Sequence, residues 1–201
     1  MTDTASATTT QPTTKYRKDY QPPTHLVDTF DLEFDLAEEH TRVRSRICIR
    51  QNPASREEAG FLVLNGEGLD LVRVTVDGTV LGKDRYRVGK ETLTLTGLPA
   101  ECVLDIEVVI EPQENTCFEG LYRSGPMFLT QCEAEGFRRI TYYLDRPDIM
   151  SLFTTTIEAD KARFPLLLSN GNPVHSEELP GGRHRVTWED PFKKPCYLFA
   201  L

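Results

Sequence analysis

Apolar and polar residues alternate along most of this chain with a period of two, which is typical of β-strands whose two faces meet different environments. In residues 29–36, four apolar side chains alternate with Thr29, Asp31, Glu33 and Asp35. Residues 42–49 and 102–110 repeat the pattern. Shorter apolar runs predict further strands at residues 61–64, 72–76, 93–95, 153–159, 166–168, 184–188 and 197–201.

Turn dipeptides separate several of these runs, among them Asn65-Gly66 and Asp77-Gly78. Turns about every 8–12 residues predict an all-β, mostly antiparallel domain in which sheets pack against sheets. Residues 138–145 lack the alternation, follow Gly136 and stop before Pro147, so we expect one short helical segment there. Neither a repeat nor an internal linker is evident, so the sequence predicts a single domain over residues 15–201.

Residues 1–14 are rich in threonine and poor in apolar side chains, which predicts a disordered tail. The tail has no apolar core of a signal peptide, and no stretch approaches the roughly 20 apolar residues of a membrane helix. The net charge of −8, without a basic run, argues against a nucleic-acid partner. The last residues, CYLFAL, are apolar and end without a turn, so we expect the domain to continue into a longer protein.

Cysteine and histidine spacing excludes several kinds of site. The five cysteines form no C-x-x-C pair and their number is odd, which favours reduced thiols in the cytoplasm over a zinc ribbon or a disulfide framework. Cys132 neighbours Glu133 and no basic residue, so a nucleophilic role is disfavoured. The four histidines include no i, i+4 pair and no H-E-x-x-H, so we expect no zinc-binding helix in this chain. His184 alternates with apolar residues and is expected to be packed.

Residues 131–145, QCEAEGFRRITYYLD, place a glutamine and two glutamates close together. In an extended chain, Gln131, Glu133 and Glu135 project to the same side. Their amide and carboxylate oxygens suit a protonated amine, which offers three N–H donors and a charge. The same spacing also fits a solvated polar face of a strand, and spacing alone leaves both interpretations open.

The wider sequence around this segment resembles the N-terminal domain of the zinc aminopeptidases of the aminopeptidase N family. Six segments carry the resemblance in order: YRKDY (16–20), LNGE (64–67), EGLY (119–122), residues 130–148, LLSNGN (167–172) and PFKKPCYLFAL (191–201). The bacterial, alanyl-preferring branch is the most similar subfamily. The resemblance implies a saddle-shaped β-domain that leans on a thermolysin-like catalytic domain, expected after residue 201.

That catalytic domain would hold the zinc of the full-length protein, because neither G-x-M-E-N nor H-E-x-x-H occurs in this chain. The resemblance assigns Glu133 to the α-ammonium of the peptide substrate and Gln131 to the same amine or to the first side-chain pocket. It implies a cis peptide bond between Glu133 and Ala134, and it leaves Glu135 a supporting or structural role. The chain alone would then be inactive.

Two alternatives come from other classes of protein. A stand-alone β-sandwich binding module for a glycan or a protein would be expected to expose aromatic platforms, whereas the aromatic residues here alternate inward. A relative with epoxide hydrolase activity would carry glutamine in place of the anchoring glutamate, and residue 133 is a glutamate.

Overall fold

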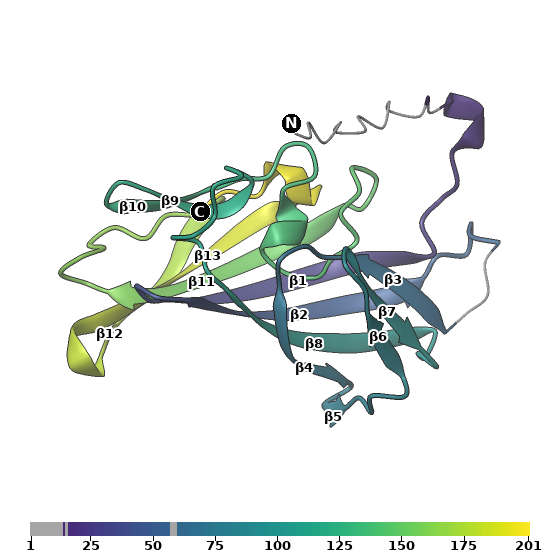
Figure 1. Ribbon diagram of the computed structural model, residues 1–201, viewed down its shortest axis with the longest axis horizontal. Coiled ribbons are helices and arrows are strands. Elements are labelled where there is room, and N and C mark those ends of the chain that lie inside the picture. Colours follow the sequence, from purple (N-terminus) through teal and green to yellow (C-terminus); the bar gives the residue numbers. More distant parts are fainter. Residues whose placement is uncertain (1–13, 15, 57–59) are drawn as a thin grey trace, which may run out of the picture.

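The computed structural model describes residue 14, residues 16–56 and residues 60–201, shown in Figure 1. The predicted disordered tail, residues 1–14, lies outside the described residues except for Thr14. Within the described part, strands dominate and the helical elements are single 3-10 turns: η1 (Arg17–Asp19), η2 (Phe137–Arg139), η3 (Pro180–Gly182) and η4 (Cys196–Leu198). The prediction of an all-β domain is confirmed.

One large twisted sheet organises the fold (Figure 1). Its strand order is β12 (Asn172–Leu179), β13 (Arg183–Lys194), β11 (Ser151–Asp160), β1 (His25–Leu36), β2 (Thr41–Gln51), β8 (Glu101–Ile110), β4 (Asp70–Val76) and β5 (Thr79–Val80). Strands β1 and β11 run parallel, with Phe30 opposite Phe153. The other neighbouring strands are antiparallel.

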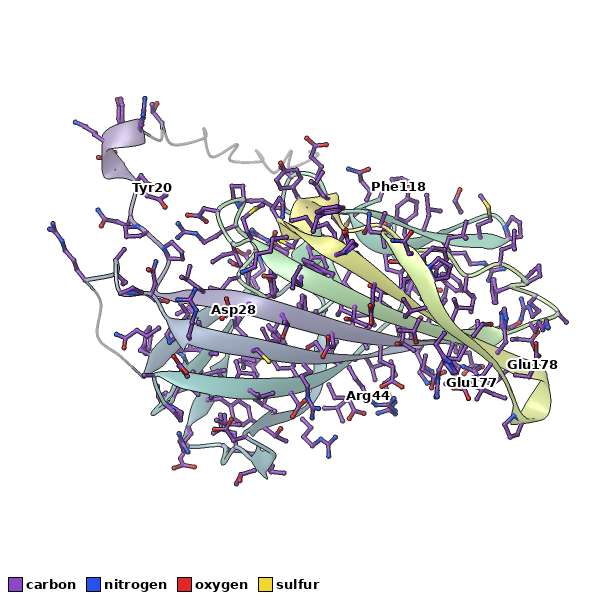
Figure 2. All side chains as sticks on the ribbon, turned by 180° about the vertical axis from the view of Figure 1, so that it is seen from behind. Tyr20, Asp28, Arg44, Phe118, Glu177 and Glu178 are labelled. Atoms are coloured by element: carbon purple, nitrogen blue, oxygen red, sulfur yellow. The ribbon has the colours of Figure 1, made fainter. Side chains whose placement is uncertain are left out.

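The two faces of this sheet follow the alternation in the sequence. Phe30, Leu32 and Phe34 of β1 are buried on the inner face. On the outer face, Arg44 Nη1 lies 3.3 Å from Glu33 Oε1 in a largely exposed ion pair. In Figure 2, Arg44 lies on the other side of the sheet from Phe118. Exposed pairs of this kind contribute little to stability, so apolar packing on the inner face holds the sheet in place.

Two smaller sheets complete the domain. One has the order β3 (Phe61–Asn65), β7 (Thr92–Thr96) and β6 (Tyr86–Val88). Its apolar residues Leu62, Leu64, Leu93 and Leu95 are buried in the common core. The other is the hairpin of β9 (Gly120–Ser124) and β10 (Met127–Gln131). Residues 131–145 follow directly from the second strand of this hairpin.

An aromatic cluster joins the large sheet to residues 131–145. The rings of Phe30 and Tyr143 stack with centroids 4.4 Å apart and planes 5° apart. Phe137 meets Phe30 edge to face at 5.7 Å and Phe199 at 5.4 Å. Such pairs add about 0.5–1.5 kcal/mol each beyond the area that they bury. The segment therefore rests on a rigid base.

The predicted helical segment is present but shorter than expected. The turn η2 covers Phe137–Arg139, whereas residues 138–145 were predicted. The backbone of Tyr143 is not available for helical hydrogen bonds, because its N–H donates to Asn65 O at 3.1 Å and its carbonyl accepts from Asn65 N at 2.8 Å. This isolated bridge ends the helical conformation.

Two predicted strands are wrong. Residues 166–168 form no strand, and the side chains of Leu166 and Leu168 are 77% and 59% exposed. Residues 197–201 form the turn η4 and irregular structure in place of a strand. The carbonyl oxygen of Leu198 accepts a hydrogen bond from the side chain of Asn170, so side chains rather than a neighbouring strand satisfy this backbone.

His184 is packed, as predicted: it is 5% exposed, and its Nε2 lies 2.8 Å from the carbonyl oxygen of Phe164. The sequence pattern missed the edge strand β12, whose residues are mostly exposed. Without a buried face, an edge strand has no alternation of apolar residues to reveal it.

Candidate functional site

Residues 131–145, called the 131–145 loop from here on, begin where the ladder of β10 ends. Gln131 is the last residue of β10 and pairs with Gly120 of β9. A turn follows, in which Gly136 N donates to Cys132 O at 3.0 Å. The expectation of an extended chain through Gln131, Glu133 and Glu135 is therefore wrong. The predicted cis peptide bond between Glu133 and Ala134 is confirmed.

Two close approaches of the backbone give the turn its shape. A Cβ atom on Gly136 would lie 2.5 Å from the carbonyl oxygen of Gln131 and 3.0 Å from the nitrogen of Gly120. Gly120 itself has a φ of +72°, a conformation that favours glycine. The two glycines let the loop fold back on the start of β9, which explains the residue types at these positions.

Gln131 and Glu133 lie together at the exposed start of the loop. The side-chain amide Nε2 of Gln131 donates a hydrogen bond to the carbonyl oxygen of Glu133 at 3.1 Å. Because the amide nitrogen faces Glu133, the Oε1 atom of Gln131 is left as an acceptor. The carboxylate of Glu133 is exposed, and no cationic side chain within the described residues pairs with it.

Four other carboxylates lie in or beside the loop, and all of them are paired with Arg138 or Arg139. Arg138 Nε lies 2.9 Å from Asp145 Oδ2, and Arg138 Nη2 lies 3.4 Å from Glu135 Oε1. Arg139 Nη2 lies 2.7 Å from Glu67 Oε2, and Arg139 Nε lies 3.2 Å from Glu119 Oε2. Each of these four carboxylates thus has an arginine partner, whereas Glu133 has no cationic partner among the described residues.

Segments far apart in the sequence meet at this loop. The amide of Glu67 donates to the carbonyl of Arg138 at 2.9 Å, and Asn65 bridges Tyr143. Close to the loop, Thr130 Oγ1 accepts a hydrogen bond from the amide of Leu201 at 2.9 Å. Several segments that carry the sequence resemblance therefore form one spatial cluster around residues 131–145.

The thiols beneath the loop are not nucleophiles. Burial, with a smaller contribution from the charge of Asp145, raises the pKa of Cys132 to about 12. Burial also raises the pKa of Cys196, whose Sγ donates to Asp145 Oδ1 at 3.1 Å. A thiol must ionise to attack a substrate, so the structure agrees with the sequence-based argument against Cys132.

Within residues 14, 16–56 and 60–201, no group of three or more His, Cys, Asp and Glu side chains is placed to hold a metal ion. The same residues contain no helix of the length and apolarity that crossing a bilayer requires. The residues present therefore do not fit a zinc ion, and no chemical step of this chain is assigned to one.

Sequence reasoning predicted Gln131 and Glu133 but missed Arg138, Arg139 and Asp145. In the sequence, Asp145 lies in a charged stretch around Pro147, and nothing in the pattern of residues indicates that its carboxylate is buried. The adjacent arginines were the available signal, because two cations follow two glutamates in one short segment. Only the fold shows which acid each arginine meets.

Together, the fold and the loop define a β-domain that presents one free carboxylate beside an amide oxygen on a rigid base. The chain belongs to the peptidase M1 N-terminal domain family, whose sequence profile matches residues 20–198.

Named relatives agree with this assignment. The chain is 50% identical over 183 residues to aminopeptidase N of Caulobacter vibrioides, which covers 91% of this chain and 21% of that protein. It is 49% identical over 193 residues to aminopeptidase N of Escherichia coli, covering 96% of this chain and 22% of that protein. The chain thus spans about a fifth of the length of these relatives.

Among solved structures, aminopeptidase A of Legionella pneumophila in complex with aspartic acid superposes with a TM-score of 0.86 at 35% identity. The match covers 92% of this chain and 22% of that one. An M1 zinc metallopeptidase of Deinococcus radiodurans matches with a TM-score of 0.75 at 16% identity, over 90% of this chain and 42% of that one. The second match supports the fold alone.

Proposed function

We propose that this chain is the substrate-anchoring domain of a zinc aminopeptidase that removes N-terminal residues from peptides in the cytoplasm. Glu133 binds the α-ammonium of the peptide, and the Oε1 atom of Gln131 accepts a hydrogen bond from the same group. Zinc and the residues that activate water belong to a catalytic domain of the full-length protein. The family membership and the greater length of the relatives support this arrangement.

The observation that carries the proposal is that no cationic side chain in the described part of the chain pairs with Glu133. Glu135, Asp145, Glu67 and Glu119 already have arginine partners. An exposed carboxylate without a partner can bind a cationic ligand without first breaking an ion pair. The adjacent Gln131 oxygen adds an acceptor of the kind an ammonium group requires.

The same geometry explains why such an enzyme would act at chain ends. Zinc bound by the catalytic domain would activate water, and Glu133, by holding the free amine, would bring the first peptide bond of the substrate within reach of that water. A peptide with a blocked amine lacks the charge that Glu133 recognises. Binding of the free amine by Glu133 therefore directs cleavage to the peptide bond after the first residue.

The test uses the full-length protein that carries this chain, with an alanyl anilide as substrate. Glu133→Ala removes a charge-assisted hydrogen bond worth roughly 1.5–3 kcal/mol, so kcat/KM should fall on the order of 10- to 150-fold. Glu101→Ala is the matched control, because Glu101 is an exposed glutamate at the start of β8 with no ion-pair partner among the described residues. An unchanged kcat/KM in Glu133→Ala would overturn the anchoring role.

A further inference from the structure

Asp145, the last residue of the 131–145 loop, has a buried carboxylate. Its side chain is 1% exposed. Oδ2 accepts hydrogen bonds from Arg138 Nε at 2.9 Å and from the backbone amide of Arg138 at 3.2 Å. Oδ1 accepts one from the thiol of Cys196 at 3.1 Å. Asp145 thus joins η2 to the C-terminal segment of the described chain.

Arg138 extends this contact toward the surface. Its Nη2 atom lies 3.4 Å from Oε1 of Glu135, which is two residues after Glu133. Its carbonyl oxygen accepts the amide of Glu67 at 2.9 Å. The side chains of Arg138 and Asp145 are 15% and 1% exposed, so water competes little for their contact, whereas Glu135 is 64% exposed. Asp145, Arg138 and Glu135 therefore form a continuous chain of contacts from the core to the loop.

The loop around Glu133 is held at both ends. On one side, Gln131 belongs to the β9–β10 ladder. On the other side, Arg138 contacts Glu135 and is held by Asp145. The residues in between have few ways to move without breaking one of these attachments, so the position of the Glu133 carboxylate depends on both.

A buried ion pair needs an explanation other than stability. Removing two charges from water costs several kcal/mol, and apolar pairs of similar volume are often as stable. Burial alone would lower the pKa of the Arg138 guanidinium, but the hydrogen bond and the charge of Asp145 raise it. An apolar pair could fill the same space, but it would offer Glu135 no partner. The hydrogen bond to Asp145 instead orients the planar guanidinium of Arg138 so that Nη2 lies near Glu135.

We propose that Asp145 is a positioning residue for substrate binding, which acts through Arg138 and Glu135 to set the location of the Glu133 carboxylate. It touches no substrate itself. The ligand whose binding it controls is the α-ammonium group of a peptide. This inference rests on the proposed function of Glu133 and adds the residues that hold it in place.

A double-mutant cycle in the full-length protein tests the inference with the alanyl anilide substrate. Asp145→Asn should lower kcat/KM by roughly tenfold to a hundredfold, the effect of displacing a binding group by about 1 Å. In the Glu133→Ala background, the same substitution should change kcat/KM by less than about twofold, because the group it positions is gone. Glu135→Gln should show the same dependence on Glu133 with a smaller effect.

Glu158→Gln serves as the control for loss of a partly buried ion pair. Glu158 is 19% exposed and lies 2.9 Å from the guanidinium groups of both Arg183 and Arg185, away from the loop. It should leave kcat/KM within about twofold of the parent. Melting curves of all variants show whether each one folds.

The outcomes separate the two proposals. If Glu133→Ala leaves kcat/KM unchanged, the anchoring function itself fails. If Glu133→Ala lowers kcat/KM but the effect of Asp145→Asn is absent or simply adds to it, the positioning role is overturned and the anchoring function stands. If Asp145→Asn does not fold, the Glu135→Gln cycle decides in the same way, since Glu135 is exposed.

Discussion

The amide nitrogen of Gln131 lies 3.1 Å from the carbonyl oxygen of Glu133, so the two residues assigned to the substrate amine also hold each other. This contact orients Gln131 with its oxygen outward. It links a residue of a regular strand to a residue of an irregular turn. Because Gln131 is fixed by its pairing in the β9–β10 hairpin, this hydrogen bond also restrains the backbone at Glu133.

Removing this contact should weaken substrate binding. Gln131→Ala is expected to lower kcat/KM of the full-length protein about two- to twelvefold, the effect of losing one hydrogen bond of about 0.5–1.5 kcal/mol. Gln21→Ala is the control, because Gln21 contributes its backbone carbonyl, not its side chain, to the bond with Arg146. Equal activities of the two variants would contradict a role for the Gln131 side chain.

The close approach at Gly136 predicts a loss of both stability and activity in Gly136→Ala. The added Cβ would lie 2.5 Å from the carbonyl oxygen of Gln131, a backbone atom that cannot move without disturbing β10. Overpacking of this kind costs about 1–3 kcal/mol. Melting curves and kcat/KM of the full-length protein measure the two effects.

Gly82→Ala provides the comparison for Gly136→Ala. The nearest neighbour of a Cβ on Gly82 is the flexible carboxylate of Asp84. A loss at Gly82 as large as that at Gly136 would show that the contact with Gln131 is not the cause.

Buried His25 predicts a pH dependence of stability. Burial lowers the pKa of His25, a residue that is 1% exposed. The unfolded chain then binds a proton more readily than the folded chain, so stability is full above pH about 6.5 and falls as the pH drops below it. Urea unfolding of the 201-residue chain at pH 7.5 and 5.5, followed by the fluorescence of Trp188, should show this loss.

His25→Gln should reduce the loss between pH 7.5 and 5.5, since glutamine does not titrate. His175→Gln should leave the loss as it is, because His175 is exposed. The same pH dependence in the parent and in His25→Gln would assign the effect to other groups.

Cysteine reactivity follows from burial. Exposed Cys117 should react with iodoacetamide at pH 8, whereas Cys132 and Cys102, whose pKa values burial raises to about 12 and about 11, should not. Mass spectrometry of the native protein, with a urea-unfolded sample as control, measures the modification at each site. Fast labelling of native Cys132 would contradict the burial of the loop base.

The alternation of apolar residues was sufficient to predict β1, β2 and β8, because each has one buried face and one polar face. It was not sufficient where apolar residues serve another purpose. Phe199 lies in an apolar run but its ring packs into the aromatic cluster, and the backbone around it bonds within the η4 turn and to the side chain of Asn170. A period of two predicts which residues face inward, but it does not show whether a neighbouring strand exists.

The sequence by itself determined the all-β class, the faces of the long strands and, through resemblance, Gln131 and Glu133 as the candidate anchor. Those properties depend on local periodicity and on residue identity, which the sequence displays directly. Tertiary structure alone decided that the charge of Glu133 stays free. That outcome depends on Arg138 reaching Asp145 within the loop and on Arg139 reaching Glu67 and Glu119 of two other segments. The pairing of charges is set by distance in space rather than along the chain.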